Sequence, residues 1–141
     1  MKSLLCGSRR FLVFALFSAL LLSACSADAP RVALADLDFS LADPGSGEKL
    51  FNQSNNESPA CSACHSLTGE SSGIGNSLGD LAAVAGARVK GQSAEEYLYW
   101  SILRPGQHLV TGYANLMYSR YEDSLERADL ADLIAYLLTL D

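Results

Sequence analysis

Apolar residues are distributed differently at the two ends of this chain. Near the C-terminus they recur at positions i, i+3, i+4 and i+7 of a helix: Leu130, Leu133, Ile134 and Leu137. Acidic residues occupy the opposite side of the same helix: Glu126, Asp129 and Asp132. This spacing predicts an amphipathic helix with one buried face, capped by Ser124 or a neighbouring residue.

Shorter helical patterns precede this one. Ser93 and Glu96 form a capping box before an apolar segment that Pro105-Gly106 ends, which predicts a helix between them. Ser46 is expected to cap a short helix that directs Leu50 and Phe51 inward. Residues 81–87 are expected to form a short helix or turn. Residues 67–80 are rich in glycine and serine, which predicts a loop.

The N-terminal apolar residues have another character. Residues 11–22 form an apolar run after Lys2, Arg9 and Arg10, which is typical of an export signal and is shorter than the roughly 20 residues of a membrane-spanning helix. Leu22-Ser23-Ala24-Cys25 resembles the lipobox of bacterial lipoproteins. That resemblance implies removal of residues 1–24 and lipid attachment to Cys25; the alternative is an ordinary signal that leaves Cys25 as a spare thiol.

This processing predicts three parts: a signal (1–24), a lipid-anchored flexible tether (25–44) and a folded domain (45–141). The tether is expected to be mostly extended, although a partly alternating apolar pattern suggests that a segment of it lies against the domain or a partner. The protein is therefore expected to be exported and anchored on the extracytoplasmic side, periplasmic or outer.

Charge narrows the range of partners. The chain has 10 basic and 16 acidic residues, and loss of three basic residues with the signal leaves 7 against 16, a net charge of −9. Nucleic acid and anionic lipid headgroups would repel such a domain. Protein partners are then expected to present basic docking surfaces, unless the acidity only maintains solubility.

The candidate chemistry lies in Cys61-Ser62-Ala63-Cys64-His65, because a C-x-x-C-H sequence is typical of covalent haem attachment. In a helical turn both cysteines and His65 share one face. The thiols would form thioethers with one haem c, and His65 would bind its iron. A disulfide, a thioredoxin-like pair and half of a zinc site are the alternatives, but neither the βαβ pattern nor a second ligand pair is present.

Three segments resemble class I c-type cytochromes: Gly47-Glu48-Lys49-Leu50-Phe51-Asn52, the C-x-x-C-H motif, and Asp132-Leu133-Ile134-Ala135-Tyr136-Leu137. The resemblance implies a small all-α fold whose N- and C-terminal helices cross and whose loops enclose the haem. Gly47 would lie at the crossing, with Tyr136 against Gly47 and Phe51.

The resemblance also implies further site residues. Gly75-Asn76-Ser77-Leu78 replaces the family's G-P-x-L, so the carbonyl of Asn76 would accept the hydrogen bond of His65; a plain surface loop is the alternative. Met117 would be the distal iron ligand, with His108 as competitor. Trp100 is a candidate for contact with the haem, or else an ordinary core residue.

If His65 and Met117 both bind iron, no coordination site remains for a substrate. We therefore expect a membrane-anchored mono-haem electron-transfer protein, not an enzyme, that exchanges single electrons with redox partner proteins of a respiratory or photosynthetic chain. It would act as a tethered carrier or as a subunit of an oxidoreductase complex. The alternatives are a gas-binding or sensing haem protein with an open sixth site, and a lipoprotein binding module without haem.

Overall fold

The computed structural model describes residues 29–55, 58–71 and 74–141. Its α-helices are α2 (Pro44–Asn52), α3 (Leu81–Val84), α4 (Ala94–Leu103) and α5 (Arg127–Leu137). Four 3-10 turns join them: η1 (Leu34–Asp36), η2 (Cys61–Ala63), η3 (Ala85–Ala87) and η4 (Tyr121–Asp123). The described residues form no strand, only an isolated bridge between Asn55 and Ser58. The predicted all-α fold is confirmed.

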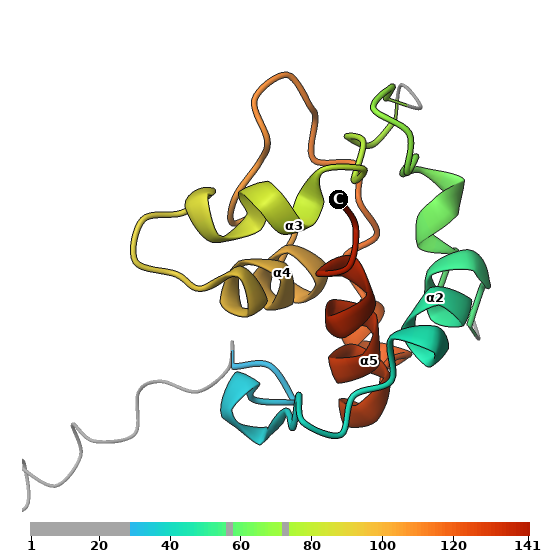
Figure 1. The fold of residues 1–141 in the computed structure, drawn as a ribbon, viewed down its shortest axis with the longest axis vertical. Helices are drawn as coiled ribbons and strands as arrows, with labels where there is room; N and C mark the ends of the chain where they lie inside the picture. The colour runs from blue at the N-terminus through green and yellow to red at the C-terminus, as the bar shows by residue number, and fades with distance from the viewer. Residues whose placement is uncertain (1–28, 56–57, 72–73) are drawn as a thin grey trace, which may run out of the picture.

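Helices α2 and α5 cross closely, as Figure 1 shows, and Gly47 lies at the crossing. A Cβ on Gly47 would come within 2.6 Å of the carbonyl carbon of Asp132 and 2.7 Å of the Tyr136 Cβ. Only glycine allows the two backbones to approach this far. The rings of Phe51 and Tyr136 lie 5.6 Å apart beside the contact. The predicted packing of Tyr136 against Gly47 and Phe51 is therefore confirmed.

Two of the three predicted helix caps agree with the structure. Ser93 accepts a hydrogen bond from the Glu96 amide at the start of α4, as predicted. The prediction of Ser46 is wrong, because Asp43 caps α2 and Pro44 occupies its first position. Helix α5 is capped by a neighbour of Ser124, Glu126, through a capping box with Asp129. Proline suits the first helical position, where an N–H would have no partner within the helix.

The interior joins one face of α5 to residues of α2 and α4. Its most completely buried large side chains are Phe51, Tyr99, Leu103, Leu130, Leu133 and Ile134. The predicted spacing in α5 thus corresponds to its buried face. The predicted loop of residues 67–80 has no helix or strand among its described residues, and residues 81–87 form α3 and η3 as expected.

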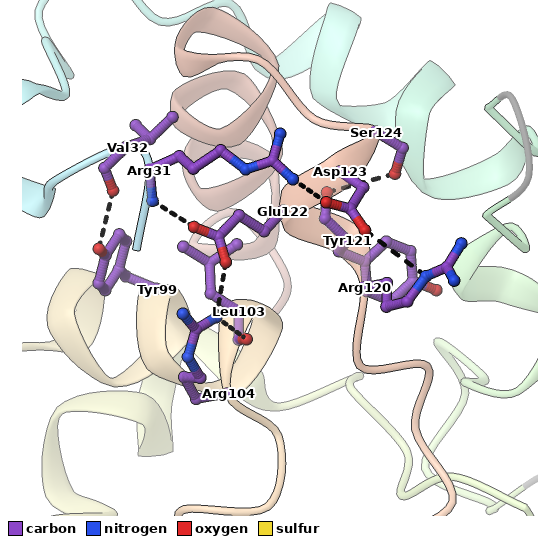
Figure 2. A network of polar contacts seen from close by, with 10 residues as sticks. All are labelled: Arg31, Val32, Tyr99, Leu103, Arg104, Arg120, Tyr121, Glu122, Asp123 and Ser124. Atoms are coloured by element: carbon purple, nitrogen blue, oxygen red, sulfur yellow. Dashed lines mark hydrogen bonds and ion pairs between the residues drawn. The ribbon is translucent and has the colours of Figure 1, made fainter. Parts of the chain in front are cut away.

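Residues 31–43 form a segment that packs against the helices and is not an extended tether. Leu37 is buried, and Val32, Leu34 and Phe39 pack against the core. The hydroxyl of Tyr99 donates a hydrogen bond to the Val32 carbonyl over 2.8 Å (Figure 2). The folded unit therefore starts near residue 31, and the expected boundary at residue 45 lies inside it. Residues 1–28, with the predicted signal and Cys25, lie outside the described residues.

Glu122 holds this segment through two partners, which Figure 2 shows. The Arg31 amide donates to one carboxylate oxygen, and the Arg104 guanidinium lies 2.8 Å from the other. Burial opposes ionisation of Glu122, but the contacts with Arg31 and Arg104 together lower its pKa. The Glu122 side chain is only 15% exposed, so this ion pair is screened less than a surface pair. Among the described residues, no helix combines the length and apolar character needed to cross a membrane.

Candidate haem site

The C-x-x-C-H motif forms a tight turn. Cys61, Ser62 and Ala63 make up η2, and the His65 amide donates to the Cys61 carbonyl over 3.0 Å. This i to i+4 bond brings the imidazole back beside the first cysteine. Cys61, Cys64 and His65 all line the same cavity, as the spacing predicts, and the two cysteines are thiols rather than a disulfide.

That cavity has a volume of about 390 Å³ and mostly apolar walls. The scaffold contributes Phe51, Leu81, Leu98, Ile102, Leu133 and Leu137 to its floor. The loop after α4 contributes much of another wall: Leu109, Val110, Tyr113, Leu116, Met117 and Tyr118. An apolar chamber of this kind suits a flat hydrophobic ligand held by few polar groups.

One nitrogen of His65 is fixed by the loop beneath it. Nδ1 donates a hydrogen bond to the Asn76 carbonyl over 2.9 Å, so the expected partner of His65 is present. With Nδ1 protonated, Nε2 is the basic nitrogen and can bind a metal, which is how ligating histidines are usually oriented. Asn76 supplies this acceptor without the fixed φ angle that a proline would give.

Gly75 makes room for that imidazole, a role that the sequence analysis missed. A Cβ at Gly75 would lie 2.7 Å from both Cε1 and Nδ1 of His65, and 2.8 Å from the Cys64 carbonyl oxygen. The Gly75 amide also donates to that carbonyl over 3.0 Å. The loop therefore holds the motif by a backbone bond and a steric fit. The sequence analysis placed Gly75 in the segment that replaces the family's G-P-x-L, but it assigned a role only to Asn76.

Tyr121 is a second residue that the sequence analysis missed. It is buried, lines the cavity and donates a hydrogen bond to the Pro59 carbonyl over 3.0 Å. Burial raises the pKa of Tyr121, and the neighbouring Cys61 raises it further. Burial also raises the pKa of the Cys61 thiol to about 11, so at neutral pH the sulfur belongs to the uncharged wall. This hydrogen bond therefore links η4 to Pro59, which directly precedes the C-x-x-C-H segment in the sequence.

The remaining predicted site residues do not all reach the cavity. Met117 is partly buried and lines it, and the exposed His108 lines it next to Tyr97, with ring centroids 5.8 Å apart. Trp100 does not: it packs edge-on against Tyr99 at 4.8 Å and borders a separate polar cavity of about 130 Å³. Trp100 is partly buried and packs against the core, which agrees with the alternative that it is an ordinary core residue.

These donors fit haem c better than the alternative ligands. Two thiols and an imidazole with a fixed tautomer lie on the wall of an apolar chamber, which matches covalent attachment and axial ligation of one hydrophobic macrocycle. A structural zinc site requires four nitrogen or sulfur ligands. The described residues contain no group of three or more His, Cys, Asp and Glu side chains able to hold a metal ion. When bound, haem supplies an iron that changes oxidation state by one electron.

Comparison with known proteins gives one match. The family model described as "Cytochrome c" matches residues 46–141. Curated proteins and solved structures both gave no match. The matched region includes the C-x-x-C-H turn, the cavity loops and the helix that crosses Gly47, and covers more than half of the chain. With its all-α fold and its cavity lined by two cysteines and a histidine, the chain belongs to the cytochrome c family, whose members bind haem c and typically transfer electrons.

Proposed function

We propose that this protein is a class I, mono-haem cytochrome c that is anchored to the membrane by a lipid on Cys25 and transfers single electrons between redox partner proteins. One observation carries the proposal: His65 lies beside Cys61 and Cys64 on an apolar cavity wall, with Nδ1 held by Asn76. This arrangement leaves Nε2 as the nitrogen for axial ligation of iron.

Met117 is the proposed sixth ligand. It is partly buried, packs against the core and lines the same cavity as His65. A thioether is a soft axial ligand that raises the reduction potential of haem iron. If His65 and Met117 both held the iron, the haem would supply one-electron chemistry and no coordination site would remain for a substrate. The competing residue, His108, is exposed and lies nearer the end of α4.

The surrounding residues suit electron transfer because they hold the site rigidly. The Gly75 amide and the Asn76 carbonyl fix the motif from one side, and Tyr121 fixes its entry through Pro59. The apolar walls exclude water, which lowers the cost of reorganising solvent when the charge changes. We place the protein in a respiratory or photosynthetic chain, as a tethered carrier or a subunit of an oxidoreductase complex, on the extracytoplasmic side.

The proposed anchor would hold the domain close to the bilayer. Only six residue steps separate Cys25 from Arg31, the first residue of the packed N-terminal segment. Fully extended, six residues reach at most about 20 Å. The lipid would therefore restrict the domain to a layer beside the membrane, where it meets membrane-bound partners more often than a soluble carrier would. Metabolic labelling with radioactive palmitate, compared between the wild type and Cys25→Ser, tests the anchor directly.

The axial ligands are tested by Met117→Ala in the holoprotein. We expect the absorption band near 695 nm, the family's usual sign of methionine ligation in the oxidised state, in the wild type and not in the variant. The reduction potential should also fall. His108→Ala is the matched control and should keep the band. A wild type without the band that binds carbon monoxide would instead indicate a gas-binding haem protein, and a colourless mature protein would indicate a binding module without haem.

A further inference from the structure

The loops that open onto the cavity carry almost no charge. No Asp, Glu, Lys or Arg occurs in residues 58–69, 71–79 or 105–119, and Glu70 is the single exception between the first two stretches. These loops contain the cysteines, His65 and Met117. The 26 charged residues of the chain therefore lie almost entirely outside these loops.

Three exposed apolar side chains lie where these loops border the cavity, and we call them the apolar rim: Ile74, Leu109 and Leu116. They are 52%, 47% and 70% exposed, and each also lines the cavity. A single exposed leucine is ordinary on a protein surface, but three around the mouth of one cavity form an interaction surface.

One group of acidic residues lies in and beside the N-terminal segment, where the Asp43 amide donates to the Asp132 carboxylate. Asp36 and Asp38 belong to the N-terminal segment, and Asp43 caps the start of α2. Asp129 and Asp132 lie on α5. Figure 1 shows the N-terminal segment (blue) and the loop after α4 (orange) at opposite ends of the molecule. Electrostatic attraction between exposed charges fades within about 8–10 Å at physiological salt. A basic partner would therefore be attracted to these acidic residues and not to the apolar rim.

We propose that the apolar rim is the docking surface for the redox partner, and that this partner presents an uncharged, apolar face instead of the basic face that net charge alone predicts. The proposal rests on the proposed electron-transfer function. Burying Leu109 and Leu116 supplies the attraction, and the uncharged side chains of residues 105–119 add no cost of desolvating an unpaired ion. Association should thus depend little on ionic strength.

Electrodes coated with defined monolayers serve as the probe. The mature holoprotein carrying Cys25→Ser, which cannot be acylated, is studied by voltammetry on a methyl-terminated and on an amine-terminated monolayer. We expect a reversible signal on the methyl surface that persists at high salt. Leu109→Ser and Leu116→Ser should each weaken adsorption there by roughly tenfold. Leu41→Ser is the matched control, because Leu41 is 81% exposed but lies in the N-terminal segment.

Several results would overturn the proposal. The first is a signal confined to the amine surface and abolished by salt. The second is an equal effect of Leu41→Ser and the rim variants. The third is a wild-type dimer in sedimentation that Leu116→Ser abolishes, which would assign the rim to a second copy of this chain. Titration with a dissolved redox mediator separates the two proposals: failure of reversible oxidation in solution would refute electron transfer itself, whereas success in solution without adsorption refutes only the docking surface.

Discussion

The crossing of α2 and α5 and the loops around the cavity are built in different ways. At the crossing, Phe51, Leu130 and Ile134 are at most 1% exposed, and regular helices satisfy the backbone. Around the cavity, residues 104–120 contain no helix, and Leu109 and Leu116 remain exposed. The crossing is stabilised by contacts within the protein itself. The loops are arranged around a ligand site, so their order depends more on what binds there.

The largest effect should follow loss of haem attachment. In Cys61→Ala/Cys64→Ala we expect loss of cooperative folding, because fewer than about 120 folded residues bury a limited core and the cavity walls then lack their ligand. Far-ultraviolet circular dichroism during thermal melting measures this. Ser62→Ala, an exposed residue of the same turn, is the control and should melt like the wild type. Native helicity with a cooperative transition in the double variant would show that the crossing folds the domain alone.

A smaller but still large effect is expected at the crossing itself. Gly47→Ala would force a methyl group to within 2.6 Å of the Asp132 carbonyl carbon, so the helices must separate. We expect a loss of about 2–4 kcal/mol in the free energy of unfolding. Gly86→Ala is the matched control, because its nearest neighbour would lie at 3.8 Å. Denaturant titration of both holoproteins gives the difference, and equal stability of the two variants would contradict a tight crossing.

Much of the scaffold was predictable because local signals there agree. The spacing of Leu130, Leu133, Ile134 and Leu137 indicates both the helix and its buried face. The partner of Ser93 is the Glu96 amide, three residues later, so this helix cap could be predicted from a segment of four residues. Ser46 was a wrong choice because Asp43, one residue before a proline, competes for the same role. Such errors are confined to helix ends, where several residues suit one position.

The site was predictable only as far as one contiguous motif allowed. Cys61, Cys64 and His65 are recognisable by their spacing. Gly75 acts on His65 across a loop, and Tyr121 acts on Pro59, which is 62 positions away in the sequence. The packing of the N-terminal segment was also underestimated, because Arg31 and Val32 find their partners 91 and 67 positions away. The periodic spacing of apolar residues carries no information about contacts between residues so far apart in the sequence. For Trp100 both contact with the haem and core packing stayed open, because residue type does not determine which side of a helix faces a cavity.

The N-terminal segment tests a smaller contribution to stability. It contacts η4 through Arg31, and Tyr121 of η4 lines the cavity. In Glu122→Gln we expect a loss of about 1–2 kcal/mol at neutral pH, because Arg104 loses a mostly buried ionic partner. The lowered pKa of Glu122 means that its contribution is complete above the ordinary value of 4.5 and disappears as pH falls through the folded-state pKa. The stability difference between wild type and variant should therefore shrink with acidification below pH 4.5. A constant difference between pH 7 and pH 3 would attribute the loss to packing.

The smallest expected effect concerns the same segment but leaves every charge in place. Tyr99→Phe removes the hydroxyl that donates to the Val32 carbonyl, which should cost about 0.5–1.5 kcal/mol. Because Tyr99 does not line the cavity that contains His65, the haem spectrum and reduction potential should stay unchanged. Hydrogen exchange followed by mass spectrometry should show faster exchange in residues 31–43 and no change in the Cys61–His65 turn. If exchange increased equally in both, the segment and the site would be one cooperative unit, and the distinction between scaffold and ligand-ordered loops would fail.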